Sequence, residues 1–470
     1  MRTPRPSSAW PSLAGPAVLV LATVLACDEP AVEALADRGA LADAGHNDAG
    51  SLDAHTSDHA SGDAPPTQDA ALAVDRWIAD VMAGDPGSAR PDAGAPDLAT
   101  VADSGSGFDA GHQLPAPLVL LHLSDIHFGS GSFAVPAFEL ATDEIIPTVA
   151  PLVTFASGDL VEVGNNAEAW DDYMAHLDAS GLDDQNFIEV PGNHDIYLDL
   201  DLSEYLAHTL AGRAGHGTHG LYSLSSAWGR LRVLALDTVS SGDPLRDSTG
   251  YLAPAQVDEL IAVMATETEP AAITVALGHH PIDIDGLSLF NTDDDLLRVL
   301  DAAGADAYLF GHRHIHMLSW RGSCLFSMAR TLGNPGDANA ASRAGFNILV
   351  YDDGLTARGV PLDEANMAVP WPVVMITRPA NPALGSGNPW AQPLPRASGE
   401  QLLRAMVFAP GVTPEPLRYR VDDGAWQTMR RVDRHYEARF ETPDAAQCQL
   451  EVEAATAGVL ARDILHIDLQ

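Results

Sequence analysis

Five short apolar runs, each followed at once by polar and ionisable residues, most constrain how this chain of 470 residues can fold. The runs span Leu118 to Leu123, Leu152 to Ala156, Phe187 to Val190, Ile273 to Leu277 and Ala307 to Phe310. Runs of this length are typical of buried strands, and helical patterns such as Ala167 to Asp178 separate them. The alternation predicts an α/β layered domain. Because ligands of open α/β sheets bind outside the carboxyl ends of the strands, we expect the five polar clusters to converge on one edge.

The polar clusters contain residue types that bind metal ions. They are Ser124-Asp125-Ile126-His127, Ser157-Gly158-Asp159, Pro191-Gly192-Asn193-His194-Asp195, Gly278-His279-His280-Pro281 and Gly311-His312-Arg313-His314. Asp125 and His127 lie two residues apart at a strand end, so both side chains can point the same way. Oxygen and nitrogen donors without sulfur suit Zn, Mn or Fe rather than calcium. The candidate ligands are too many for one tetrahedral ion and favour two ions, divalent or trivalent, that share a bridging carboxylate. These ligands are Asp125, His127, Asp159, Asn193, His279, His312 and His314.

This set of motifs resembles the calcineurin-like metallophosphoesterases. Their pattern Asp-x-His, Gly-Asp, Gly-Asn-His-Asp/Glu, Gly-His and Gly-His-x-His is matched in order, type and strand context between Ser124 and His314. The resemblance implies a four-layer α/β/β/α metallophosphoesterase sandwich. It also implies that Asp159 bridges two metal ions. One ion would take Asp125, His127, Asp159 and His314, and the other would take Asp159, Asn193, His279 and His312.

The same resemblance implies the chemistry of the site. Two divalent ions and two ligand carboxylates would leave a formal charge of about +2, which attracts phosphate to an otherwise acidic chain. Ions roughly 3.5–4 Å apart lower the pKa of a bridging water, so we expect a phosphoester hydrolase with a metal-bridging hydroxide as nucleophile. In the family the histidine equivalent to His194 lies near the leaving-group oxygen, as a general acid or a phosphate contact. We expect Asp195 to accept a hydrogen bond from that imidazole, and the alternative makes Asp195 a helix cap or loop carboxylate. His280 and Arg313 either touch substrate or lie behind the ligands or at the surface.

The substrate class stays open between phosphomonoesters and phosphodiesters, lipid headgroups included. A formal net charge of −40, from 65 acidic and 25 basic residues, argues against binding of a nucleic-acid duplex. The alternative from another class is a non-catalytic envelope or surface binding lipoprotein with a vestigial phosphoesterase core. Vestigial cores usually lose ligands, whereas all seven ligands and His194 are present here, so we favour catalysis.

The N-terminal segment indicates export. Arg2 and Arg5 precede an apolar run from Leu13 to Ala26, which is shorter than the ~20 residues of a spanning helix and predicts a signal peptide over residues 1–27. Its end, Val24-Leu25-Ala26-Cys27, resembles the bacterial lipobox. The resemblance implies lipidation of Cys27, a bacterial cell-envelope location and membrane contact through the lipid only. The alternative is a cleaved secretory peptide whose cysteine is accidental.

Residues 28–115 read as a disordered acidic linker. They carry 17 acidic residues and three arginines within sequence rich in Ala, Gly, Ser and Asp, which offers little apolar surface for a core.

We place the phosphoesterase domain at residues 116–365 and a small all-β sandwich at residues 366–470. Beyond the loop-like stretch from Pro379 to Pro395, short segments of period two are separated by turn residues. This pattern resembles Ig-like or fibronectin-like modules, and we expect the module to pack against the catalytic domain. Cys324 and Cys448 either form an interdomain disulfide after export or remain two buried free thiols.

Overall fold

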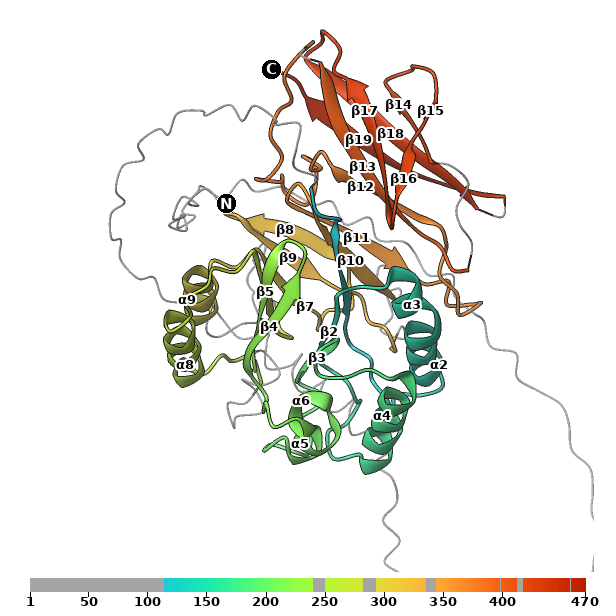
Figure 1. Cartoon of the computed structure of the whole chain (residues 1–470). Helices are drawn as coiled ribbons and strands as arrows, with labels where there is room; N and C mark the ends of the chain where they lie inside the picture. The colour runs from blue at the N-terminus through green and yellow to red at the C-terminus, as the bar shows by residue number, and fades with distance from the viewer. Residues whose placement is uncertain are drawn as a thin grey trace, which may run out of the picture. The chain divides into compact units, whose positions relative to one another are not determined.

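The structure is a computed structural model that describes residues 114–239, 250–281, 293–334, 344–397, 399–411, 417–456 and 458–470 (Figure 1). All of these residues fall within one compact unit. The predicted signal peptide, the candidate lipidation site Cys27 and nearly all of the predicted linker lie outside the described residues. Within the described ranges, no helix is both long enough and apolar enough to cross a membrane.

The first sheet has five strands in the order β11-β10-β1-β2-β3. β1, β2 and β3 are parallel, whereas β10 and β11 are antiparallel additions. Every residue of β1, β2 and β3 is buried, which explains why these strands are continuous apolar runs in the sequence. The predicted first and third runs are confirmed, and the second begins one residue later. The bounds are β1 Leu118–Leu123, β2 Val153–Ser157, β3 Phe187–Val190, β10 Gly345–Tyr351 and β11 Leu355–Pro361.

The second sheet has six strands in the order β4-β5-β6-β7-β9-β8. β5, β6, β7 and β9 are parallel, and β4 and β8 pair antiparallel at the two edges. The predicted runs at β6 and β7 are confirmed. The bounds are β4 Gly220–Ser226, β5 Gly229–Ala235, β6 Ile273–Leu277, β7 Ala307–Phe310, β8 Met317–Arg321 and β9 Cys324–Met328.

The two sheets pack face to face, with helices on both outer surfaces. Leu120 and Phe155 of the first sheet share one apolar cluster with Val275 and Leu309 of the second. A second cluster joins the outer face of the first sheet to α2, α3, α4 and α5, and a third joins the second sheet to α8 and α9. The four-layer α/β/β/α fold is therefore confirmed. The bounds are α2 Ala134–Leu140, the π-helix η1 Ala141–Ile145, α3 Ile146–Val149, α4 Ala167–Ser180, α5 Ser203–His208, α6 Leu210–Arg213, α8 Pro254–Ala265 and α9 Asp293–Ala303.

The C-terminal part consists of two antiparallel sheets, in the orders β12-β13-β17-β16 and β15-β14-β18-β19. Alternate residues such as Tyr419, Leu450 and Leu465 form their shared core. The prediction of a C-terminal all-β part is confirmed, and the Ig-like resemblance stays a prediction. The bounds are β12 Val373–Arg378, β13 Glu400–Phe408, β14 Arg418–Val421, β15 Gln427–Thr428, β16 Arg430–Val432, β17 His435–Glu441, β18 Gln447–Thr456 and β19 Val459–Asp468.

Arg404 of β13 connects this C-terminal part to the start of the described chain. Its side chain is only 2 % exposed. The guanidinium donates to the carboxylates of Glu437 and Asp352 at 3.0 and 3.2 Å, and to the carbonyl oxygens of Pro115 and Leu114 at 2.8 and 3.3 Å. One buried arginine thus neutralises two carboxylates and fixes the residues that lead into β1.

Cys324 and Cys448 are free, buried thiols in two different apolar clusters. Of the two alternatives that the sequence left open, the structure has the free thiols and not the disulfide.

Candidate metal centre

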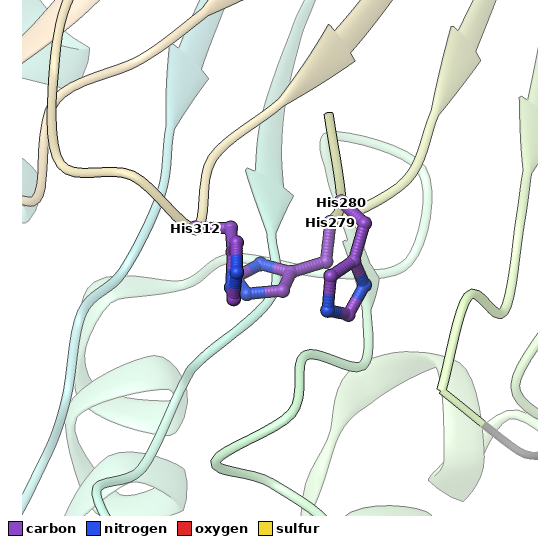
Figure 2. Close-up of side chains that lie close together, drawn as sticks. All are labelled: His279, His280 and His312. Carbon is purple, nitrogen blue, oxygen red and sulfur yellow. The ribbon is translucent and has the colours of Figure 1, made fainter. Parts of the chain in front are cut away.

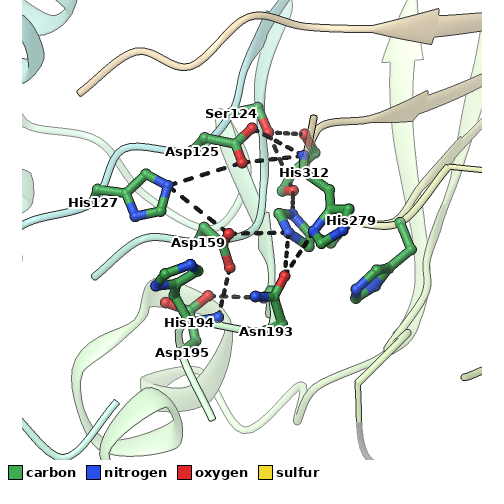
Figure 3. A network of polar contacts seen from close by, with 12 residues as sticks. Ser124, Asp125, His127, Asp159, Asn193, His194, Asp195, His279 and His312 are labelled. Atoms are coloured by element: carbon green, nitrogen blue, oxygen red, sulfur yellow. Dashed lines mark hydrogen bonds and ion pairs between the residues drawn. The ribbon is translucent and has the colours of Figure 1, made fainter. Parts of the chain in front are cut away.

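The seven candidate ligands lie together, on the loops that follow β1, β2, β3, β6 and β7 (Figure 3). In the first group, Nε2 of His127 lies 3.2 Å from Nε2 of His314, and Oδ1 of Asp125 lies 3.2 Å from the same His314 atom. All three residues are buried. Imidazole nitrogens and a carboxylate oxygen therefore face one shared position, as the ligands of a single ion do.

The second group is built around Asp159, Asn193 and two histidines. Oδ1 of Asn193 lies 3.1 Å from Nε2 of His279 and 2.8 Å from Nδ1 of His312. Oδ2 of Asp159 lies 3.1 Å from Nε2 of His279. The same oxygen lies 3.9 Å from Nε2 of His127, which belongs to the first group. Asp159 thus stands between the two groups, where a bridging ligand would be needed.

Five of the seven candidate ligands have a left-handed backbone, which L-residues seldom adopt. Their φ angles are 51° for Asp125, 54° for His127, 52° for Asp159, 72° for His312 and 53° for His314. Each such residue costs on the order of 1 kcal/mol, so the surrounding structure must hold it in place. The amide of Asp125 donates to Gly158 O at 3.0 Å, and the amide of His127 donates to Asp159 O at 2.9 Å. Strain of this kind gathers at functional sites rather than in ordinary loops.

Two glycines allow the ligand loops to approach one another. A Cβ on Gly192 would lie 2.2 Å from Oδ1 of Asp159, and one on Gly311 would lie 2.2 Å from Oδ2 of Asp125. Any side chain at either position would therefore displace a candidate ligand.

The charges of the site suit bound cations. Burial by itself opposes ionisation of Asp159, but His279 and His194 hold the pKa of this carboxyl well below its usual range. Burial likewise opposes the charged form of His279, yet Asp159 and Asp125 raise the pKa of this imidazole to about 9. Burial and the neighbouring His280 lower the pKa of His312. Two ionised carboxylates thus hold a proton on His279 that a metal ion would displace on binding.

His194 lies beside the ligands, with its side chain 15 % exposed. Its amide donates to Oδ1 of Asp159 at 2.8 Å, and its Nδ1 lies 2.9 Å from the carbonyl oxygen of Glu162. Its ring packs edge-on against that of His127, with centroids 4.7 Å apart.

The role predicted for Asp195 needs correction. Oδ1 of Asp195 accepts the amides of Leu160 and Val161 at 2.8 and 3.0 Å, and Oδ2 accepts the amide of Gly192 at 2.8 Å. Both carboxylate oxygens are therefore engaged with the backbone, and Nδ1 of the His194 imidazole lies against the main-chain carbonyl of Glu162. Burial and the nearby Asp159 raise the pKa of Asp195 to about 7. The alternative of a loop carboxylate describes this residue better than the expected hydrogen bond to His194.

Two residues that sequence reasoning missed complete the surroundings. Oε2 of Glu162 lies 2.9 Å from Nδ1 of the candidate ligand His127. The hydroxyl of Tyr197 accepts a hydrogen bond from Nδ2 of Asn193 at 3.0 Å, which turns Oδ1 of that amide toward the histidines. The available signals were weak: Glu162 is an acid three residues after Asp159, and Tyr197 is an aromatic residue four residues after Asn193.

His280 and Arg313, whose roles the sequence left open, differ in exposure. His280 is buried, and its ring lies 4.6 Å from that of His312 and 4.9 Å from that of His279 (Figure 2). Nδ1 of His280 lies 3.0 Å from the Thr238 hydroxyl. Arg313 is exposed on the loop between two candidate ligands.

The fold and the clustered donor residues together suit a site for metal ions. Residues 118–316 match the sequence model described as Calcineurin-like phosphoesterase, which is the family that the motifs resemble. No curated protein matches the chain.

Solved structures with a similar fold have low sequence identity to this chain. GAP50, the anchor in the inner membrane complex of Plasmodium, is 13% identical, with a TM-score of 0.35, over 54% of this chain and 87% of its own. The calcineurin-like phosphoesterase YfkN from Bacillus subtilis is 14% identical, with a TM-score of 0.33, over 52% and 90%. The phosphoesterase Yfce from E. coli is 15% identical, with a TM-score of 0.27, over 54% and 97%.

Proposed function

We propose that this protein hydrolyses phosphoester bonds and depends on two metal ions, each of them Fe, Mn or Zn. The observation that carries the proposal is the convergence of seven donor residues into two groups, with Oδ2 of Asp159 3.1 Å from His279 in one and 3.9 Å from His127 in the other. Ions bound there would supply positive charge for the phosphoryl oxygens and an activated water as nucleophile.

In the proposed reaction, some residues bind the metal ions and another transfers a proton. Asp125, Asp159 and the histidines hold the cations, and these cations overcome the acidity of the chain for an anionic substrate. A carbonyl oxygen only accepts, so Nδ1 of His194 carries a hydrogen toward Glu162 O. In the doubly protonated ring Nε2 carries the second hydrogen, and it is the atom that would pass this proton to the leaving-group oxygen and leave the imidazole neutral.

Hydrolysis assays with metal-reconstituted protein test this proposal. We expect turnover of p-nitrophenyl phosphate or bis-p-nitrophenyl phosphate after addition of Mn, Fe or Zn, together with about two bound metal ions per chain. The two substrates separate monoesterase from diesterase activity. Absence of both bound metal and turnover would favour the alternative of a non-catalytic binding protein.

A His194→Ala variant tests the proton-transfer role. We expect turnover to fall by about 10²–10⁴-fold with the metal content retained, because we assign His194 to proton transfer and not to metal binding. Loss of both metals would show that His194 has been wrongly separated from the ligand set.

We further propose that the protein is exported and anchored to the cell envelope through a lipid on Cys27. The support is the apolar run that ends at this cysteine. We expect palmitate labelling of the wild-type protein and none of a Cys27→Ser variant. Labelling that persists in the variant would contradict the proposal.

A further inference from the structure

The segment that follows His194 in the chain exposes two leucines. Leu198 is 68 % exposed and Leu200 is 54 % exposed, the two highest values among the large apolar residues of the described chain. Exposed leucines are common on protein surfaces, so exposure alone indicates little. Their place in the chain and the backbone conformation of Leu198 indicate a functional role.

Leu198 has a backbone conformation that disfavours leucine. Its φ is +64°, in the left-handed region where glycine and asparagine are the usual residues. An exposed leucine in this conformation bears the backbone cost without an equivalent gain from burial. Folding stability therefore does not explain the residue, and an observed outlier of this kind supports a functional role.

The segment is held in place by its neighbours. Ile196 and Leu202 are buried on either side of the two leucines. Between them, the Asp199 carboxylate accepts the Ser203 hydroxyl at 2.7 Å and the Glu204 amide at 2.8 Å. The leucines are thus presented on a fixed turn that leads into α5.

Tyr197 joins this turn to the catalytic groups. Its ring centroid lies 4.6 Å from that of His194, and its hydroxyl accepts a hydrogen bond from the candidate ligand Asn193. His194 is the proposed proton donor to the leaving group. We define the 197–200 rim as Tyr197, Leu198, Asp199 and Leu200. The rim contacts His194 through Tyr197, and a leaving group would lie next to His194.

We propose that the 197–200 rim binds the leaving group of the substrate and that this group is uncharged and apolar next to the ester oxygen. The inference rests on the proposed phosphoesterase function and names the substrate class for the same site. Charge supports it: the exposed Asp201 and the Glu162 carboxylate beside the ligands would repel a leaving group that carries further phosphates or carboxylates. Aliphatic and aromatic groups share the required chemistry, and the test separates them.

The experiment measures competitive inhibition of p-nitrophenyl or bis-p-nitrophenyl phosphate hydrolysis by phosphonates, with the full protein in its metal-loaded form. Ethyl-, hexyl-, phenyl- and 5-carboxypentylphosphonate have the same anionic head and differ only in the group that would lie on the rim. We expect hexylphosphonate to bind about 10-fold more tightly than ethylphosphonate, because the added methylenes leave water when they contact the exposed leucines. We also expect it to bind about 10-fold more tightly than the carboxypentyl compound. Phenylphosphonate binding as tightly as hexylphosphonate would identify an aromatic group, and weaker binding an aliphatic one.

Variants of the 197–200 rim test whether its leucines cause the preference for hexylphosphonate over ethylphosphonate. In a Leu198→Asn, Leu200→Asn double variant, the preference for hexyl over ethyl should fall to about two-fold or less. Leu198→Asn alone should be at least as resistant to thermal unfolding as the wild type, since asparagine tolerates the left-handed backbone. Leu460→Asn is the matched control, because Leu460 is a 51 % exposed leucine in the C-terminal β part, and it should keep the wild-type preference.

The outcomes separate the two proposals. Absence of turnover with metals present would defeat the proposed function and this inference with it. If the protein turns over substrate but inhibition does not depend on the length of the alkyl chain, the proposed role of the 197–200 rim is wrong. The same holds if the double variant keeps the preference for hexylphosphonate. Neither result would contradict the proposed phosphoesterase function.

Discussion

Oε2 of Glu162 lies 2.9 Å from Nδ1 of His127, on the side of the imidazole opposite to the nitrogen that faces His314. A carboxylate in this position fixes the ring and its tautomer and makes the other nitrogen a better metal ligand. We expect Glu162→Gln to weaken metal binding by about 10–100-fold, measured by titration with Mn or Zn against a competing chelator.

Glu168→Gln is the matched control for this variant. Glu168 is an exposed residue in the first turn of α4, six positions further along the chain, and its replacement should leave the affinity unchanged. Equal affinities of Glu162→Gln and wild type would mean that the carboxylate has no part in ligand orientation.

Asp195 is expected to affect stability rather than the pH dependence of turnover. Its two oxygens accept three backbone amides from two loops. In Asp195→Asn the side-chain NH₂ group must face at least one of these donors, which costs about 1–3 kcal/mol in the free energy of unfolding. Urea denaturation measures this loss. A shifted pH profile of turnover with unchanged stability would instead restore the orienting role first predicted for this residue.

Glu189 is expected to make stability fall as pH rises. Its carboxyl group is buried in β3, accepts the Tyr173 hydroxyl at 2.6 Å and the Leu210 amide at 2.8 Å, and burial raises its pKa to about 7. Between the unfolded pKa near 4.5 and the folded pKa near 7, the folded state binds the proton more tightly. The stability that protonated Glu189 contributes is therefore full below the unfolded pKa and is lost as the pH rises through this window. Above the folded pKa the free energy of unfolding no longer depends on this group.

Glu189→Gln should remove this part of the pH dependence. One pKa unit corresponds to about 1.4 kcal/mol, so the wild type should lose up to about 3 kcal/mol relative to the variant across the window. Unfolding by urea at a series of pH values gives the difference. Parallel curves for the two proteins would show that Glu189 does not titrate in this range.

Replacement of Arg404 is expected to destabilise the protein strongly, because its guanidinium is buried. Replacement by leucine leaves the buried Asp352 without its cation and should cost about 3–5 kcal/mol. Arg439→Leu provides the comparison: Arg439 is 63 % exposed and pairs at 4.0 Å with the equally exposed Glu400, so the change should be near zero. Similar losses for both variants in urea denaturation would contradict the importance given to burial.

Much of the α/β core follows from the sequence because parallel buried strands appear as uninterrupted apolar runs. β1, β3, β6 and β7 have the predicted bounds, and the polar residues after them meet as expected. The edge strands β8 and β11 are not among the predicted strands. All residues of β8 are half-buried, and Arg358, Gly359 and Pro361 interrupt the apolar residues of β11.

The contacts that surround the candidate ligands could not be predicted either, and the reason is different. Asp195 turns toward amides of Leu160 and Val161, about 35 residues earlier, and this choice depends on the relative path of two loops. Glu162 and Tyr197 act through the same loops. A sequence motif specifies which residues are close to the metal ligands, but not which atoms they offer.

Strand β1 also separates the N-terminal side of the described chain from the candidate metal centre. Arg404 fixes Leu114 and Pro115 just before this strand, and the ligands Asp125 and His127 follow its other end. A six-residue strand spans about 20 Å. Immobilisation through the N-terminal side of the chain would therefore attach the core at the end of β1 remote from the candidate ligands. Even a bulky substrate could then reach the face that carries these residues without passing the point of attachment.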